Sequence, residues 1–154
     1  MSQVNPVEAL LRDQLPRYEL ALERNPEGPG APNARLRVLI IPFVLANGRP
    51  FPPAPRPRGE HQGAPEKCFE TAQLYVIGHP DHLYVEGFAL VGGELFHHAW
   101  AATPSDGVVD LRWPDPESCA YFGVPFSSSS IAALLRELGH YGDVLELVAA
   151  RAQS

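Results

Sequence analysis

The sequence predicts a single α+β domain, residues 1–154, in which helices flank an antiparallel β-meander. Three observations predict this class. Residues 83–113 hold three short apolar runs separated by tight turns, a pattern typical of consecutive antiparallel strands. Helix-capping residues occur on both sides of this stretch. With 154 residues, 45% of them hydrophobic, the chain can bury a core without disulfides or metal ions.

The N-terminal part predicts helices that serve packing. The segment Asn5-Pro6-Val7-Glu8 combines a capping side chain, a proline at the first helical position and a glutamate that reaches back. We expect Pro16 to kink or end this helix and residues 17–24 to resume it. Residues 25–33 are predicted to be a turn-rich linker.

A strand and a proline-rich segment are predicted next. Residues 35–45, RLRVLIIPFVL, have the β-branched content of a buried strand, which Pro42 should end. Residues 49–65 contain prolines at positions 50, 52, 53, 55, 57 and 65, which favours an extended conformation outside any sheet interior. This segment is either an exposed surface loop or a wall or lid over a site, since long irregular connections in compact domains tend to be functional.

The next predicted helix carries Cys68 near its start. Pro65 can serve as its first residue, apolar residues continue at helical spacing, and Gly78 and Pro80 should end it. Cys68 is therefore expected in the first helical turn.

The remaining elements form a meander and two terminal helices. The strands are predicted at residues 83–90, 95–103 and 108–113, with turns at 91–94 and 105–107. Residues 114–126 are predicted to be irregular. The serine run 127–130 should cap a helix that Gly139 closes, and Asp143 with Glu146 should cap the last helix.

Charge and cysteine usage narrow the possible functions. Twelve basic against 18 acidic residues give a net charge of −6, which argues against a nucleic-acid partner. Two cysteines do not make a disulfide framework, although a single Cys68–Cys119 bridge remains open. No apolar stretch approaches the roughly 20 residues that span a bilayer, and the N-terminal residues MSQVNPVEAL lack a basic region followed by a long apolar run. We therefore expect a soluble cytoplasmic protein without a membrane partner and without a cofactor.

Cys68 is the candidate nucleophile. A thiol becomes reactive when a helix N-terminus or a neighbouring imidazolium lowers its pKa, and the backbone N–H groups of a first helical turn can receive an oxyanion. The alternative is a small buried hydrophobic residue, since free cysteine is among the most buried residue types.

A histidine and an aspartate could complete the site. Adjacent residues of a strand face opposite ways, so only one of His97 and His98 can point toward Cys68. Asp110 lies across a tight turn from both, where a carboxylate could hold the second imidazole nitrogen. An aspartate inside the run GVVDLRW is unusual for a strand interior. Alternatively, the histidine packs in the core and Asp110 is an exposed strand end.

This order of residues resembles a known family. A cysteine that opens a helix, the segment HAW on the second strand and an aspartate in VVDLRW look like the transglutaminase-like branch of the papain-like fold. The resemblance covers residues 65–126, where YVEGFAL and YFGVPF are similar to small bacterial and phage proteins of this type. It implies that Cys68 is the nucleophile, that His98, directly before Ala-Trp, is the base, and that Asp110 orients it.

The resemblance also implies an architecture. The nucleophile helix would pack on the antiparallel meander in a papain-like core, about residues 65–126. Residues 1–64, with their helices, strand and proline-rich loop, and the C-terminal helices of residues 127–154 would be additions to it. The segment Lys67-Cys68-Phe69 departs from the Cys-Trp that many relatives show, which leaves the substrate open.

Four further residues are candidates for substrate binding. Gln62 could reach an oxyanion, as a glutamine does in papain, or could be solvated. Glu86 is a strand-interior carboxylate that needs water or a partner, and it could line the cleft. Trp100 is either core or a pocket wall, and Tyr121 either borders a substrate groove or packs inside.

Three functions are compatible with these residues. The first is a cysteine-dependent acyl-transfer enzyme: an amide or peptide hydrolase, a deamidase or a transglutaminase-like enzyme, working through a thioester on peptide or protein amides. The second is an inactive binding or adaptor domain with the proline-rich loop as its interaction surface. The third is a metal held by Cys68, His98 and Asp110, although no close-spaced ligand pair supports it. The sequence fixes neither the acyl acceptor nor the oligomeric state.

Overall fold

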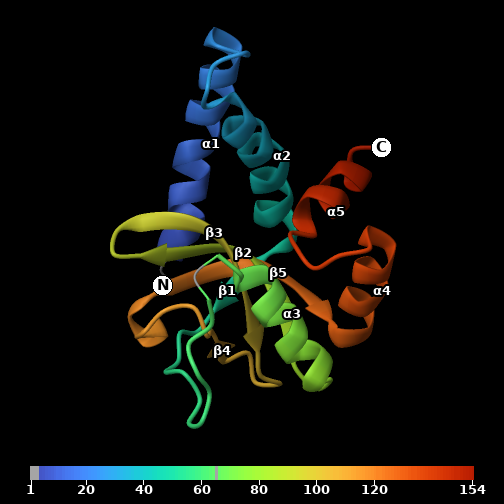
Figure 1. The fold of residues 1–154 in the computed structure, drawn as a ribbon. Helices are drawn as coiled ribbons and strands as arrows, with labels where there is room; N and C mark the ends of the chain where they lie inside the picture. The colour runs from blue at the N-terminus through green and yellow to red at the C-terminus, as the bar shows by residue number, and fades with distance from the viewer. Residues whose placement is uncertain (1–3, 65) are drawn as a thin grey trace.

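The structure, a computed structural model, describes residues 4–64 and 66–154 (Figure 1). Within these residues one antiparallel sheet has the strand order β1-β5-β2-β3-β4. The strands are β1 (Arg49–Phe51), β2 (Leu83–Val91), β3 (Glu94–Ala102), β4 (Val108–Val109) and β5 (Ala120–Ser127). The helices are α1 (Pro6–Arg24), α2 (Ala31–Asn47), α3 (Cys68–Gly78), α4 (Ser128–Leu138) and α5 (Leu145–Ala152), with a short 3₁₀ turn at Pro116–Ser118. The predicted mixed α+β class is confirmed.

Helix α1 begins where the sequence predicts. The Asn5 side chain accepts hydrogen bonds from the backbone N–H groups of Val7 at 2.8 Å and Glu8 at 3.3 Å. The helix continues through Pro16 to Arg24, so the predicted end at Pro16 is wrong, whereas the helical conformation of residues 17–24 is confirmed and a kink at Pro16 stays a prediction. The apolar face of α1 packs along α2, and this packing offsets the loss of stability caused by the backbone hydrogen bond that a proline removes.

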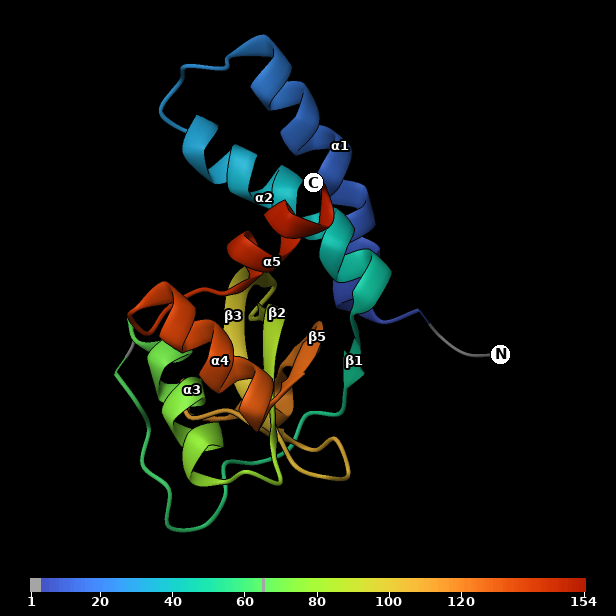
Figure 2. The same ribbon diagram turned by 90° about the vertical axis from the view of Figure 1, so that its right-hand side faces the viewer.

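The strand predicted at residues 35–45 is wrong, because this segment is part of α2. Within it Ile40, Ile41 and Val44 are buried at helical spacing, and Pro42 lies inside the helix. Apolar content alone cannot distinguish a buried strand from a buried helix. Packing against α1, α5 and β5 decides for the helix, and the predicted linker shortens accordingly. The α1–α2 hairpin projects beyond one end of the sheet (Figure 2).

The proline-rich segment starts as an edge strand and continues as a loop. Residues 49–51 pair with β5 at the edge of the sheet, where a proline is tolerated. The loop is then fastened at both ends. The Val108 N–H donates to the Pro52 carbonyl at 3.2 Å, and the Gly63 N–H donates to the Leu111 carbonyl at 2.6 Å.

Helix α3 starts at Cys68 and ends at Gly78, so the expectation that Cys68 lies in a first helical turn is confirmed. The predicted helix start at Pro65 lies outside the described residues. The disulfide left open above does not form, because Cys68 and Cys119 are both free thiols.

The predicted meander is confirmed, but its third strand is much shorter than expected. A tight turn at Gly92 and Gly93 joins β2 to β3, and β4 pairs with β3 only at Ala101 and Ala102. Asp110 therefore lies just beyond a strand and not inside one. Its carboxylate accepts the backbone N–H of Arg112 at 3.0 Å, a local bond that turns the chain away from the sheet.

Residues 114–126 are not wholly irregular, which corrects the prediction. Strand β5 inserts between β1 and β2, opposite Gly87 at Gly123. A Cβ on Gly87 would lie 2.3 Å from the Phe122 carbonyl oxygen and 2.4 Å from the Gly123 Cα, so this crossing requires glycine. Pro125 pairs beyond the end of β1, where only one side of β5 is occupied. Because proline and glycine are rare inside strands, their presence in residues 120–127 argues against a strand when the sequence is read alone.

The C-terminal helices follow the predicted caps. The Ser127 hydroxyl accepts the Ser130 N–H, Gly139 ends α4 in the left-handed region, and Asp143 accepts the N–H of Leu145 at 2.8 Å and of Glu146 at 3.4 Å. Within the described residues, no helix combines the length and the apolar character needed to cross a bilayer.

The two faces of the sheet are covered differently. The face of Glu86 and His97 lies under helices, with cores formed by α1, α2 and α5 at one end and by α3 and α4 at the other (Figures 1 and 2). The face of His98 and Trp100 has a smaller core with Phe51 and Tyr121, covered by irregular segments. Each histidine of β3 therefore has a different environment.

Candidate active site

The candidate nucleophile stands at the first residue of α3. Cys68 is half-buried, and Lys67 precedes it as the residue before the helix. The first intrahelical bond runs from the Thr71 N–H to the Lys67 carbonyl at 2.8 Å. The thiol therefore lies beside the end of the helix at which backbone N–H groups and the positive end of the helix dipole are found.

His98 and Asp110 lie side by side in the interior. The Nε2 atom of His98 is 2.9 Å from Oδ2 of Asp110, and both side chains are only 2% exposed. β4 is too short to cover the part of β3 that carries His98, so this part lies at the sheet edge. Helix α3 packs on β3 from the opposite face of the sheet, and its first residue, Cys68, lines the same pocket as Asp110.

Three donors hold the carboxylate of Asp110. Besides His98, the Tyr121 hydroxyl donates to Oδ2 at 2.7 Å, and the Arg112 backbone N–H donates to Oδ1 at 3.0 Å. A carboxylate fixed in this way cannot rotate away from the imidazole. It can orient the ring and stabilise its protonated form. This is the role of the acidic residue in a catalytic triad of nucleophile, base and acid.

The electrostatics of His98 tie the three groups together. Burial by itself lowers the pKa of His98, but hydrogen bonding and charge from Asp110 and Cys68 outweigh burial and raise this pKa to about 9. The ring is therefore protonated at neutral pH. Because Nε2 faces Asp110, Nδ1 is the nitrogen left to interact with the Cys68 thiol.

A pocket opens beside the thiol. Cys68 and Asp110 both line it, and most of the remaining wall is small or apolar, including Ala64, Ala72, Ala99, Trp100, Val109 and Leu111. Gly63 and Ala64 come from the proline-rich loop, so the loop forms one wall of this pocket. The sequence left open whether this loop is only an exposed surface loop or also a wall or lid over a site. The contribution of Gly63 and Ala64 favours the wall.

The predicted substrate-binding residues occupy different places. Trp100 is 1% exposed and lines the pocket, with its ring 6.0 Å from that of His98. Tyr121 is fully buried and contacts Asp110 rather than open space. Gln62 is exposed, and its Nε2 donates to the Arg112 carbonyl at 2.8 Å. Glu86 lies on the other face of the sheet, in a separate polar cluster.

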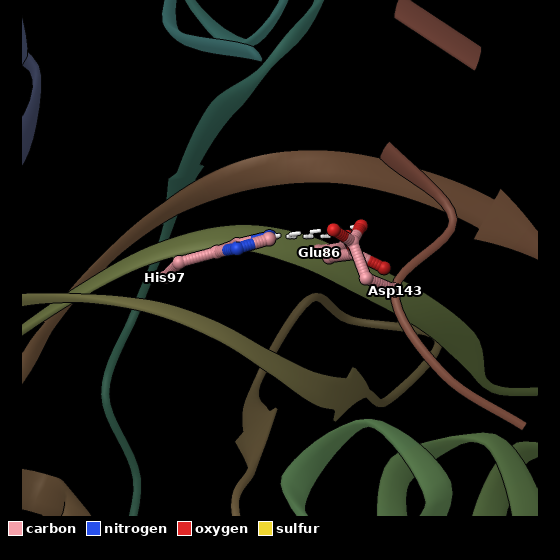
Figure 3. A group of neighbouring side chains, drawn as sticks. All are labelled: Glu86, His97 and Asp143. Carbon is pink, nitrogen blue, oxygen red and sulfur yellow. Dashed lines mark hydrogen bonds and ion pairs between the residues drawn. The ribbon is translucent and has the colours of Figure 1, made fainter. Parts of the chain in front are cut away.

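That second cluster contains the other histidine. Glu86 is fully buried, and its Oε2 lies 3.1 Å from Nε2 of His97 (Figure 3). Asp143 completes the group, with Oδ1 3.8 Å from the same nitrogen. Sequence reasoning missed this cluster, although one signal was available: the strand period places the carboxylate and His97 on one face of the sheet.

One proton is shared between the two carboxylates. Burial and the neighbouring Glu86 raise the pKa of Asp143 to about 9. Burial also raises the pKa of Glu86, but hydrogen bonds from Asp143, His97 and Tyr84 bring it below its ordinary value. At neutral pH, Asp143 is therefore a neutral acid that donates to an ionised Glu86.

The same cluster is where a metal ion could be considered. Among the described residues, Glu86, His97 and Asp143 are the side chains whose ligand atoms gather within 4.8 Å of one another. Both oxygens of Glu86 already accept two hydrogen bonds each, from Tyr84 and Val144 and from His97 and Leu145, so an ion would have to displace donors. The donor set therefore favours a hydrogen-bonded clamp over a metal centre.

The metal alternative raised from the sequence gains no support. Cys68, His98 and Asp110 do not form a group of gathered ligand atoms among the described residues.

A comparison of the chain with protein-family models, with curated proteins and with solved structures found no match in any of the three. The proposals below therefore rest on this chain's own residues.

Proposed function

We propose that the protein is a cysteine-dependent acyl-transfer enzyme of papain-like, transglutaminase-like architecture. One observation carries the proposal: the buried His98 ring pairs with Asp110 through Nε2, and the Cys68 thiol, at the start of a helix, contributes with Asp110 to the raised pKa of that ring. Cys68 of α3 and Asp110, just beyond β4, line one pocket, and His98 of β3 lies against Asp110, which supports a nucleophile, a base and an orienting acid at this place.

The first half of the reaction forms a thioester. With the proton resting on His98, the Cys68 sulfur attacks the carbonyl carbon of an amide or ester, and a carbon–sulfur bond forms. Backbone N–H groups at the start of α3 stabilise the developing oxyanion. His98 donates its proton to the leaving amine or alcohol as the bond to the carbonyl carbon breaks, and Asp110 keeps the ring oriented.

The second half releases the acyl group. The neutral His98 takes a proton from a water molecule or an acceptor amine, whose oxygen or nitrogen attacks the thioester carbon. The carbon–sulfur bond breaks, and the sulfur leaves as a thiolate beside the protonated ring. With water as the acceptor, the product is a carboxylic acid. The chemistry fits peptide or protein amides, and the groups that act on the substrate and on the acceptor are side chains and backbone groups of this chain.

Covalent labelling tests this proposal. An activated ester such as p-nitrophenyl acetate should acylate Cys68 in the wild type, as seen by intact mass and peptide mapping. Cys68→Ala and His98→Ala should each abolish the labelling. Cys119→Ala is the matched control, because Cys119 is a free, 5% exposed thiol in the loop-covered core, and it should label normally.

The opposite results would exclude the mechanism. A wild-type protein that is not acylated at Cys68, or a His98→Ala variant that is acylated at the wild-type rate, would overturn the proposal. The inactive adaptor domain would then be the better description.

A further inference from the structure

Glu86 is the most heavily bonded buried charge among the described residues that lie outside the candidate site. Its Oε1 accepts the Tyr84 hydroxyl at 2.6 Å and the Val144 N–H at 3.0 Å. Its Oε2 accepts the Leu145 N–H at 3.0 Å and pairs with Nε2 of His97 at 3.1 Å. A side chain that meets donors at both oxygens must be an acceptor only, which explains a carboxylate in the middle of a strand.

The cluster is connected to α3 along one route through an aromatic ring. The His97 ring lies 5.1 Å from the Phe69 ring in edge contact and 5.7 Å from the Phe88 ring. Phe69 directly follows Cys68 in the first turn of α3. Figure 3 shows Glu86 holding the His97 ring by its nitrogen. The position of this ring therefore limits where Phe69, and with it the first turn of α3, can lie.

A second route runs through a buried amide. Gln73 of α3 is fully buried and donates to the Gly142 carbonyl at 2.6 Å, while its oxygen accepts the Gly142 N–H at 3.1 Å. Its Nε2 also lies 3.2 Å from the Tyr84 hydroxyl, which donates to Glu86. The middle of α3 is thus bonded to the same group of residues that fixes the start of α5.

We propose that Glu86 is a positioning residue for the candidate active site: by holding His97 and Tyr84, it fixes α3 at Phe69 and Gln73 and so sets the place of the Cys68 thiol relative to His98. The inference rests on the proposed function. Glu86 never touches substrate, because its carboxylate is fully buried on the opposite face of the sheet. Displacing reacting atoms by about 1 Å can lower a rate on the order of a hundredfold.

Two variants separate positioning from simple stabilisation. Glu86→Gln keeps the shape but presents an N–H₂ group to donors, and His97→Ala removes the ring against Phe69 while leaving Glu86 bonded to α5. Each should lower the rate constant of Cys68 acylation by p-nitrophenyl acetate roughly tenfold or more, measured well below the melting temperature of the variant. His97→Phe, which keeps an aromatic ring against Phe69, should recover much of the loss seen in His97→Ala.

The matched control is Arg151→Ala. Arg151 is an exposed residue of α5 that pairs with Glu137 of α4, so the change perturbs the same helix without touching Glu86. Exposed ion pairs contribute little to stability, and the acylation rate should stay at the wild-type value.

Hydrogen exchange gives a readout that does not depend on activity. In Glu86→Gln and His97→Ala, backbone amides of residues 68–76 should exchange several-fold faster than in the wild type. A merely structural role predicts faster exchange only around residues 142–150, with wild-type exchange in α3 and a wild-type acylation rate, and that result would overturn the inference. If Glu86→Gln does not fold, His97→Ala decides by the same two measurements.

The failure of the proposed function would look different. If the wild-type protein is not acylated at Cys68, the proposed reaction is excluded. Hydrogen exchange would still decide whether Glu86 is linked to the first turn of α3. If the wild type is acylated at Cys68 but hydrogen exchange in α3 is unchanged in Glu86→Gln and His97→Ala, the proposed enzyme activity stands and the positioning role of Glu86 is excluded.

Discussion

Two adjacent histidines of β3 each pair with a buried carboxylate, yet the two pairs do different work. His98 meets Asp110 at 2.9 Å on the loop-covered face, and His97 meets Glu86 at 3.1 Å on the helix-covered face. In each pair, Nε2 faces the acid. What differs is the rest of the ring's surroundings: the Cys68 thiol contributes to the raised pKa of His98, whereas the rings of Phe69 and Phe88 lie against His97.

The carboxylates differ in what else they bind. Asp110 accepts a tyrosine hydroxyl and a loop N–H group besides pairing with His98, so its bonds fix the carboxylate beside one imidazole. Glu86 accepts two N–H groups at the start of α5, so half of its hydrogen bonds join a helix to the sheet. The comparison teaches that a carboxylate–histidine pair becomes a candidate site only where a reactive group reaches the free side of the ring.

The largest expected effect comes from removing the charge of Asp110. In Asp110→Asn the imidazolium of His98 loses its stabilising partner, and acylation of Cys68 should fall on the order of a hundredfold or more. The alkaline limb of the pH–rate profile, which His98 should set near pH 9, should move down toward the ordinary histidine pKa of 6.5. Acylation rates of the wild type and of Asp110→Asn across about pH 5–10 measure both the loss in rate and the position of the alkaline limb. A limb that stays in place would show that Asp110 does not control the ring.

A medium effect should appear in the pH dependence of stability. The folded-state pKa of Asp143 is raised from 3.8 to about 9, so folding is favoured most below pH 3.8 and this contribution is lost as the pH rises to about 9. His98, raised from 6.5 to about 9, contributes stability that is complete below pH 6.5 and lost through pH 9. Both groups therefore predict a Tm that falls between pH 6.5 and 9.

Asp143→Asn separates the two clusters in this measurement. The amide can still donate to Glu86 and cap α5 but cannot ionise, so the fall in Tm between pH 6.5 and 9 should become shallower, with His98 supplying the rest. Thermal melts followed by circular dichroism at half-unit pH steps would measure this. A slope identical to that of the wild type would mean that the two carboxylates do not share a proton.

The smallest effect is expected from Tyr121→Phe. Burial and the charge of Asp110 raise the pKa of Tyr121, so its hydroxyl remains a donor to the carboxylate at every working pH. Losing this one hydrogen bond should lower the free energy of unfolding by about 1 kcal/mol and the acylation rate by several-fold, because His98 still holds Asp110. Urea denaturation and the labelling assay measure the two. A loss as large as that of Asp110→Asn would make Tyr121 an essential part of the site.

Local signals in the sequence were sufficient for several elements. The cap at Asn5, the glycine end of α4 at Gly139 and the Gly92-Gly93 turn are decided by residues next to one another in the chain. Strand alternation placed His97 and His98 on opposite faces, while the choice of His98 came from the resemblance of the HAW segment. The same local logic placed Cys68 at a helix start, although the role of the three site residues stays a proposal.

Other features depended on contacts between distant residues. Packing against α1, α5 and β5 made residues 35–45 a helix, and pairing between two strands made β5 out of a segment with a glycine and a proline. The bond from Tyr121 to Asp110 depends on that pairing as well, since β5 carries the tyrosine.

What the sequence by itself determined is therefore the α+β class, most helix ends and the order Cys68, His98, Asp110. Only the tertiary structure decided that His98 and Asp110 meet in the interior and that Glu86 joins His97 to the start of α5. The physical reason is range: capping and turn energies act within a few residues, whereas the partner of a buried charge is chosen by whichever elements pack around it.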